Sequence, residues 1–124
     1  MTAPNPLKLR ATSGLMGAPT FEFILHIGAK QNVTGNATAN FPYLPPVGGT
    51  HHFLVSGSEH ETGFGPNHHL IYVQGSYLVP FQPPAIGELT VKVTASLTLE
   101  TDWAKGAGFI TVNGHPYQVT VTKE

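Results

Sequence analysis

Apolar and polar residues alternate without a break between Leu89 and Glu100. Leucine, valine or alanine holds every odd position, and threonine, lysine, serine or glutamate holds every even one. Successive side chains of a β-strand point to opposite faces, so this period of two predicts a strand with one apolar and one hydroxyl-rich face. At about 3.3 Å per residue the strand would span roughly 40 Å. So long a strand in so short a chain predicts an all-β fold.

Shorter segments with the same period lie between turns along the rest of the chain. The 14 glycines and 11 prolines divide the sequence into strand-length pieces. In the segment 21–27, the odd positions Phe21, Phe23, Leu25 and Ile27 form the predicted inward face. Further strands are expected at 8–12, 33–41, 50–56, 69–78, 109–112 and 117–122.

Two of the connections predict how strands pair. The segments 21–27 and 33–41 follow each other closely and are expected to form a hairpin. The dipeptide Asn113-Gly114 suits a type I′ turn between the last two strands, because both central residues of that turn need positive φ. Pro116 lies just past this turn and has no N–H to donate, which predicts that the last strand is an edge there.

Seven or eight short strands joined by turns predict a single antiparallel domain over residues 1–124. The expected architecture is a β-sandwich, and a small β-barrel is the alternative. No window of the chain shows the 3.6-residue apolar period of an amphipathic helix.

The chain carries little charge. Only 10% of its residues are charged, against about 25% in a typical globular domain. The six lysines and arginines are too few to neutralise a phosphate backbone, which argues against a nucleic-acid partner. A net charge of −1 gives weak repulsion between copies, so a homo-oligomer is expected. The chain contains no cysteine, which excludes disulfides and thiolate metal ligands.

Targeting signals are not visible in the sequence. No run of about 18 apolar residues predicts a transmembrane helix. The first ten residues lack a basic region followed by an apolar core, so a secretory signal peptide is not expected. The default expectation is a cytoplasmic protein, with leaderless export as the alternative.

Acidic and histidine residues concentrate between positions 59 and 69, and imidazole is the commonest metal ligand. A hairpin between the segments 50–56 and 69–78, with Ser56 opposite His69, would bring them together at its loop end. We expect no resident cofactor, because a solvated polar loop explains the same composition. The alternative is a site for a divalent transition metal. Its candidate ligands are Glu59, His60, Glu61, His68 and His69.

Few residues point to catalysis. The chain has no thiol and no Gly-x-Ser-x-Gly nucleophile motif, and Asp102 is its one aspartate. His60 beside Glu59 or Glu61 is the one acid–base pair that the spacing suggests. We therefore expect a protein that is not an enzyme.

Several aromatic residues fall at strand ends or in rigid loops, where such side chains contact sugars, membrane interfaces or protein partners. The same residues could instead cover the ends of the fold, and Trp103 would equally suit a place in the core. The candidates for ligand binding are Tyr43, Phe64, Tyr77, Phe81 and Trp103.

Four short parts of the chain form a recognisable set: Gly17-Ala18-Pro19-Thr20, the segments 33–38 and 83–87, and Asp102-Trp103 followed by Gly106. In these parts the chain resembles a family of small bacterial all-β domains without an assigned activity. The resemblance covers about half of the chain, and the histidine-rich middle departs from it. The resemblance implies a bacterial source and no particular chemistry.

These observations favour a non-enzymatic binding module. It would recognise a glycan, a cell surface or a protein partner through its loop aromatics, as a homo-oligomer. An alternative is a small pore-forming toxin that inserts the amphipathic strand from Leu89 to Glu100, whose threonine-rich face would line a channel. A second alternative is a metalloenzyme that uses His60, His68 and His69.

Overall fold

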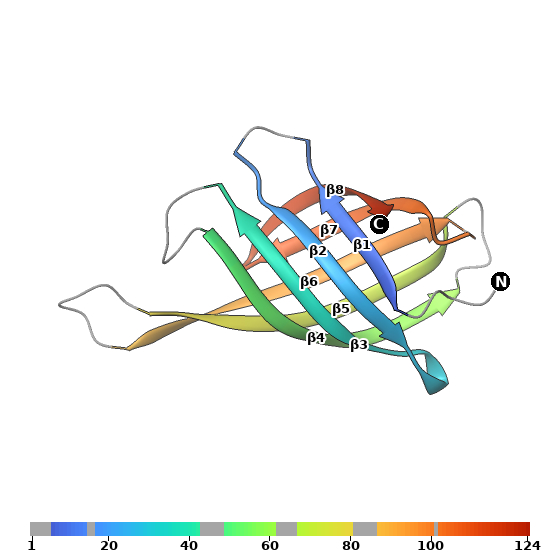
Figure 1. Cartoon of the computed structure of the whole chain (residues 1–124), viewed down its shortest axis with the longest axis horizontal. Helices are drawn as coiled ribbons and strands as arrows, with labels where there is room; N and C mark the ends of the chain where they lie inside the picture. The colour runs from blue at the N-terminus through green and yellow to red at the C-terminus, as the bar shows by residue number, and fades with distance from the viewer. Residues whose placement is uncertain (1–5, 15–16, 43–48, 62–66, 81–86, 101) are drawn as a thin grey trace.

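The chain forms a closed antiparallel β-barrel (Figure 1). The computed structural model describes residues 6–14, 17–42, 49–61, 67–80, 87–100 and 102–124. Each strand pairs with the next one along the chain, and the first pairs with the last. The elements are β1 (Leu7–Thr12), β2 (Thr20–Ile27), the short 3-10 helix η1 (Ala29–Gln31), β3 (Asn32–Phe41), β4 (Gly49–Glu61), β5 (Asn67–Pro80), β6 (Glu88–Glu100), β7 (Lys105–Val112) and β8 (His115–Lys123).

The all-β prediction is confirmed, and of the two predicted architectures the barrel is the one observed. A sandwich would leave edge strands, but here β1 runs antiparallel to β8, from Leu9 opposite Lys123 to Thr12 opposite Thr120. This pairing closes the sheet on itself and removes the edges that an open sheet would present. Within the described residues, no helix has the length and hydropathy to cross a membrane.

The barrel interior is filled by side chains from every strand. The odd positions of β2 point inward, as the pattern predicts, and Phe21, Phe23 and Leu25 are buried. The alternating segment of β6 behaves in the same way from Val91 to Leu99, with its apolar side in the core and its hydroxyl-rich side outward, whereas Leu89 is exposed. The largest fully buried side chains are Phe21, Phe23, Leu7, Leu9, Leu25, Ile71, Leu97, Leu99, Ile110, Val33, Val73 and Val93.

Glycines allow neighbouring strands to bend closely over this core. A Cβ atom at Gly57 in β4 would overlap the backbone carbonyl oxygen of Tyr72 in β5, and one at Gly106 in β7 would overlap that of Thr98 in β6. Glycine inside a strand commonly marks a place where the backbone bends or another backbone approaches closely. The tight curvature of the barrel wall therefore depends on the absence of side chains at these positions.

The two predicted hairpin turns are observed. β2 pairs with β3 across η1. Asn113 and Gly114 have φ values of 49° and 90°, as a type I′ turn requires. Pro116 pairs with Thr111 of β7 but lies in the half of β8 that has no β1 partner, so it occupies an edge position, as its missing N–H predicts.

The register of the β4–β5 hairpin differs from the prediction. Ser56 lies opposite Gln74 rather than His69, because β4 continues as a strand to Glu61 and the hairpin is longer than its apolar pattern indicates. The buried carboxyl group of Glu59 occupies an inward position, which breaks the apolar alternation that marks the strand.

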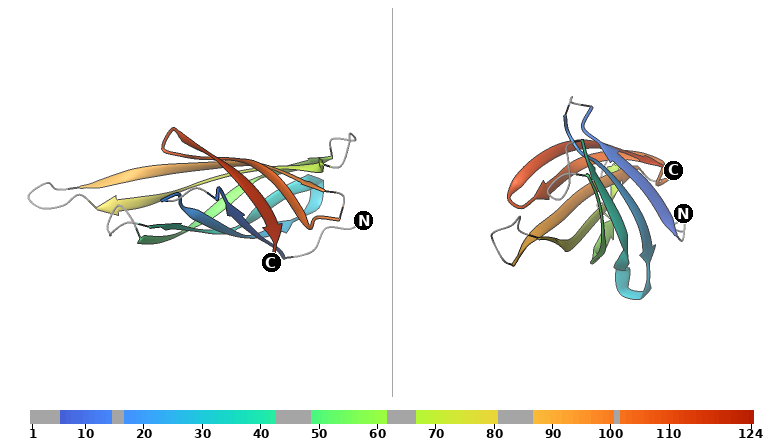
Figure 2. Two further views of the ribbon diagram at one scale, coloured as in Figure 1. Left: turned by 90° about the horizontal axis from the view of Figure 1, so that it is seen from above. Right: turned by 60° about the vertical axis from the view of Figure 1, so that its left-hand side comes forward.

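β5 and β6 extend beyond their neighbours as a two-stranded arm, which lies at the left of Figure 1 and in the left view of Figure 2. The pairing of β4 with β5 ends at Val55 and Gly75, and that of β6 with β7 ends at Val93 and Val112. Beyond these points the described residues 76–80 and 88–92 form a strand ladder with each other, and a backbone hydrogen bond of 2.7 Å from Asn113 N to Lys92 O joins the base of this extension to the turn after β7. We call these two segments the arm.

Adding a methyl group at Gly57 should destabilise the barrel. We expect Gly57→Ala to lower the free energy of unfolding by about 2 kcal/mol or more, because the new Cβ meets backbone that cannot move aside. Urea denaturation measures the loss. Gly28→Ala is the matched control, since a Cβ there would lie 3.7 Å from the Asn32 carbonyl oxygen, an ordinary contact. Equal stability of the two variants would contradict this account of the curvature.

Candidate functional site

The predicted metal ligands divide between the two faces of the barrel wall. Glu59 and His69 are buried and face the interior, whereas His60, the neighbour of Glu59, points to the opposite side and is exposed. Glu61 lies on the same side of β4 as Glu59 and pairs with His69, but as the last residue of the strand it is exposed. The Nε2 atom of His60 lies 3.2 Å from the Ser58 hydroxyl oxygen. The side chain of His68 lies outside the described part of the structure. Among the described residues, no three acidic or histidine side chains converge on one point.

Glu59 and His69 form a buried polar pair near the β4–β5 turn. The Nδ1 atom of His69 lies 3.0 Å from the Oε1 atom of Glu59, and the two residues are 3% and 4% exposed respectively. A buried carboxylate needs such a partner, because burying an unpaired charge is costly. This contact joins two of the five predicted ligands, and a metal bound there stays a prediction.

Trp103 covers this pair from the β6–β7 connection. Its indole ring stacks on the His69 imidazole, with ring centroids 3.6 Å apart and planes 18° apart. The turn is fixed by a backbone hydrogen bond from Trp103 N to Glu100 O and by one from Ala104 N to Asp102 Oδ1. Trp103 is 3% exposed and has φ of 66°, a left-handed value that is unusual for a bulky residue.

Trp103 therefore lies in the core, which is one of the two positions that the sequence analysis considered, and a role in ligand binding stays a prediction. Its indole Nε1–H is buried and has no hydrogen-bond partner in the part of the chain that the structure describes. Its described ring contact at this end of the barrel is the stack on His69.

The other predicted aromatic contacts have mixed outcomes. Tyr43, Phe64 and Phe81 lie outside the described residues. Tyr77 is not an exposed strand-end residue as expected, because it sits on the inner side of the arm and is 9% exposed. Its ring lies 4.4 Å from that of His51, nearly parallel to it, and 5.4 Å from that of Phe53.

Tyr77 also lines a cavity at the end of the barrel opposite Trp103. One wall comes from the inner side of the arm, and the other comes from the ends of β3 and β7, the turn after β7 and the start of β8. The cavity has a volume of about 200 Å³. We call it the mouth cavity, and its lining residues are Phe41, Tyr77, Val79, Leu89, Val91, Val112, Asn113 and Tyr117.

Ring contacts fix the aromatic side chains around the mouth cavity. Phe41 packs edge-to-face against Phe21, with centroids 6.3 Å apart. Phe21 also lies 6.4 Å from the ring of Tyr117, which in turn contacts His115 at 4.7 Å. Such pairs add about 0.5–1.5 kcal/mol each beyond the area they bury. The cavity wall is therefore largely preformed.

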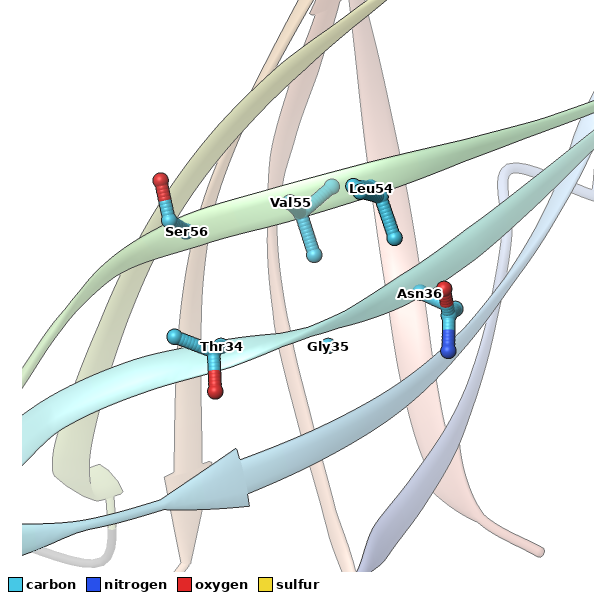
Figure 3. Close-up of a pocket in the computed structure, with 6 residues that line it drawn as sticks. All are labelled: Thr34, Gly35, Asn36, Leu54, Val55 and Ser56. Carbon is cyan, nitrogen blue, oxygen red and sulfur yellow. The ribbon is translucent and has the colours of Figure 1, made fainter.

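A larger hollow, of about 460 Å³, lies over β3 and β4 (Figure 3). It is lined by Thr34, Gly35, Asn36, Leu54, Val55 and Ser56. Leu54 is 75% exposed, and the described lining comes from two adjacent strands. This hollow is a surface groove, whereas the mouth cavity has two facing walls.

Sequence reasoning identified Tyr77 of the mouth cavity but not its other lining residues. Val79 lies just past the predicted strand 69–78, and Leu89 and Val91 were predicted as ordinary strand positions. They reach the cavity because the arm projects past the rim. The sequence did contain one sign of this arm, the unusual length of the alternating segment from Leu89 to Glu100. The segment is longer than the stretch of it that pairs with β7.

Comparison with known proteins gives no further indication of function: no family model matches the chain, and no curated protein resembles it in sequence. The predicted resemblance to small bacterial all-β domains stays a prediction.

Replacing Trp103 should unfold part of the core. We expect Trp103→Ala to lower the free energy of unfolding by about 3–5 kcal/mol, the range for removal of a buried aromatic ring. Phe109→Ala is the control, since Phe109 is 55% exposed and its loss should cost less than about 0.5 kcal/mol. Guanidinium denaturation followed by circular dichroism compares the two. Unchanged stability of Trp103→Ala would contradict the core position and would indicate that Trp103 is a surface residue.

The Glu59–His69 contact should appear as an energetic coupling. A double-mutant cycle compares the stability losses of Glu59→Ala and His69→Ala with the loss of the double variant. The double variant should lose about 0.5–3 kcal/mol less than the sum of the two single losses. Urea denaturation of all four proteins measures this difference. Glu59→Ala combined with Val112→Ala, at opposite ends of the barrel, should be additive within about 0.5 kcal/mol. Additivity in both cycles would argue that the pair is not coupled.

Proposed function

We propose that the protein is a non-enzymatic binding protein that holds one small apolar ring of its ligand in the mouth cavity. The observation that carries this proposal is the cavity itself, a partly enclosed, aromatic-lined space at the end of a barrel whose interior is otherwise packed. Mouths of β-barrels are common ligand sites, and an eight-stranded barrel is just wide enough to hold one small ligand.

The volume of the cavity limits the ligand. Sites for drug-sized molecules occupy about 300–1,000 Å³. An engineered apolar cavity of about 150 Å³ in another protein binds benzene. At about 200 Å³, the mouth cavity fits a single aromatic ring or a short branched aliphatic group.

The lining also limits the chemistry of the ligand. Valine, leucine and phenylalanine side chains supply apolar contact, and Asn113 adds an amide to the lining. The phenol groups of Tyr77 and Tyr117 add hydrogen-bonding capacity. A ring that bears one polar substituent, such as a phenol or an indole, matches this set.

The one buried acid–base pair shown by the described residues lies away from the mouth cavity, which favours binding over catalysis by that pair. Glu59 and His69 form a buried acid–base pair, but they lie at the other end of the barrel, and the packed core separates them from the mouth cavity. A ligand in the cavity would be out of reach of both side chains, and general acid–base catalysis needs hydrogen-bond distance.

Titration with p-cresol, indole and cyclohexanol tests the proposal. Nuclear magnetic resonance should show saturable shifts at the amides of Tyr77, Val91 and Val112 for at least one of these compounds. Val112→Phe should weaken binding at least tenfold, because the added ring fills the cavity. Thr111→Phe is the matched control, since it places the same ring on the outer side of β7. Lack of saturation by all three compounds, or unchanged affinity in Val112→Phe, would contradict the proposal.

A further inference from the structure

The outer surface of β5, β6, β7 and β8 carries a second feature, independent of the mouth cavity. These four strands lie side by side in the barrel wall (Figure 1). Their register places twelve outward residues in three rows of four, all of them at least partly exposed. We call these rows the outer patch. Its middle row runs Tyr72, Ser96, Phe109 and Gln118.

The outer patch contains no acidic, basic or histidine residue. The row on one side of the middle row is Leu70, Thr98, Ala107 and Thr120, and the row on the other side is Gln74, Thr94, Thr111 and Pro116. The polar groups are hydroxyls and amides, which both donate and accept hydrogen bonds. A surface of this kind offers no electrostatic preference for an anionic or a cationic partner.

Two exposed aromatic rings stand in the middle row. Tyr72 and Phe109 are 42% and 55% exposed, and each lies directly beside Ser96. They are two strand spacings apart, about 10 Å between backbones. The small serine between them leaves both rings accessible. This separation is comparable with the length of a disaccharide unit.

A groove adjoins this row along β5 and β6. Its volume is about 280 Å³, and its lining includes Gln74 and Thr94 of the outer patch together with Ser76 and Lys92. The aromatic rings and the hydrogen-bonding groove thus lie next to each other on a rigid sheet. A rigid platform loses little conformational entropy when it binds.

We propose that the outer patch binds a neutral glycan. The C–H faces of sugar rings stack on exposed aromatic rings, and sugar hydroxyls exchange hydrogen bonds with serine, threonine and glutamine side chains. In the first two rows, residues from β5 and β7 are apolar or aromatic, and those from β6 and β8 are polar. A neutral sugar chain that crosses the strands presents the same alternation of apolar faces and hydroxyl groups.

The same alternation disfavours a second copy of the chain as the occupant. Stable protein interfaces have a contiguous apolar core with few polar groups. Here Ser96 and Thr98 separate the apolar residues of β5 from those of β7. An uncharged, interrupted surface suits a ligand that carries many hydroxyl groups better than it suits a protein interface.

Isothermal titration calorimetry with cellohexaose, mannohexaose, laminarihexaose and maltohexaose tests this proposal. At least one of these should give a saturable isotherm, with an affinity that changes less than twofold between about 0.1 and about 1 M NaCl, because a neutral ligand carries no charge whose attraction salt could screen. Tyr72→Ala and Phe109→Ala should each weaken binding at least tenfold. Both residues are exposed, so both variants should fold.

Two controls separate this site from the rest of the surface. Leu54→Ala removes another exposed apolar side chain, on β4, and should leave glycan affinity unchanged. Val112→Phe, which fills the mouth cavity, should also leave it unchanged. The proposal is overturned if all four oligosaccharides fail to bind, or if the Tyr72→Ala/Phe109→Ala double variant binds like the parent. A dimer in light scattering that this double variant dissociates would assign the patch to a second copy and would also overturn it.

Discussion

The pairing of β1 with β8 is the contact on which the rest of the structure depends. Every other strand pairing joins neighbours in sequence, whereas this one joins segments more than a hundred residues apart, through the four register pairs from Leu9↔Lys123 to Thr12↔Thr120. The backbone hydrogen bond from Glu124 N to Lys8 O, at 2.9 Å, extends it. Without this seam, Leu7 and Leu9 on one side and Val121 on the other would border an open sheet, and water would reach the core.

Closure gives the barrel two ends that differ in chemistry. At one end Trp103 stacks on His69, so a buried polar pair and an aromatic ring are packed together inside the wall. At the other end the arm projects past the rim, and its inner side faces the ends of β3 and β7 across the mouth cavity. A packed floor and a partly enclosed mouth are consistent with the proposed binding role, because a ligand would then meet a preformed wall.

The sequence predicted the strands and their inward faces better than it predicted how they assemble. Alternation in residues 21–27 and 89–100 depends only on which side of a strand is buried, so it is visible locally. Closure, register and the projecting arm depend on which strands meet, and no local pattern contains that information. Glu59 shows the difficulty, since its buried carboxyl group is satisfied by His69, ten positions away, and no local pattern marks the two as partners. The mouth cavity was missed for the same reason, because it results from a mismatch in strand length.

The order of the strands also has a consequence for synthesis in the cell. As the chain leaves the ribosome, each new strand finds its partner already present, but the free edge of β1 must wait until β8 has been made. During that time an exposed edge can pair with the edge of another nascent chain. The outward residues Lys8 and Arg10 lie on β1. Their positive charges oppose pairing between the β1 edges of two copies. Charged residues on an edge strand are a common means of limiting such pairing, and Lys8 and Arg10 give β1 two of them for the interval in which the barrel is still open.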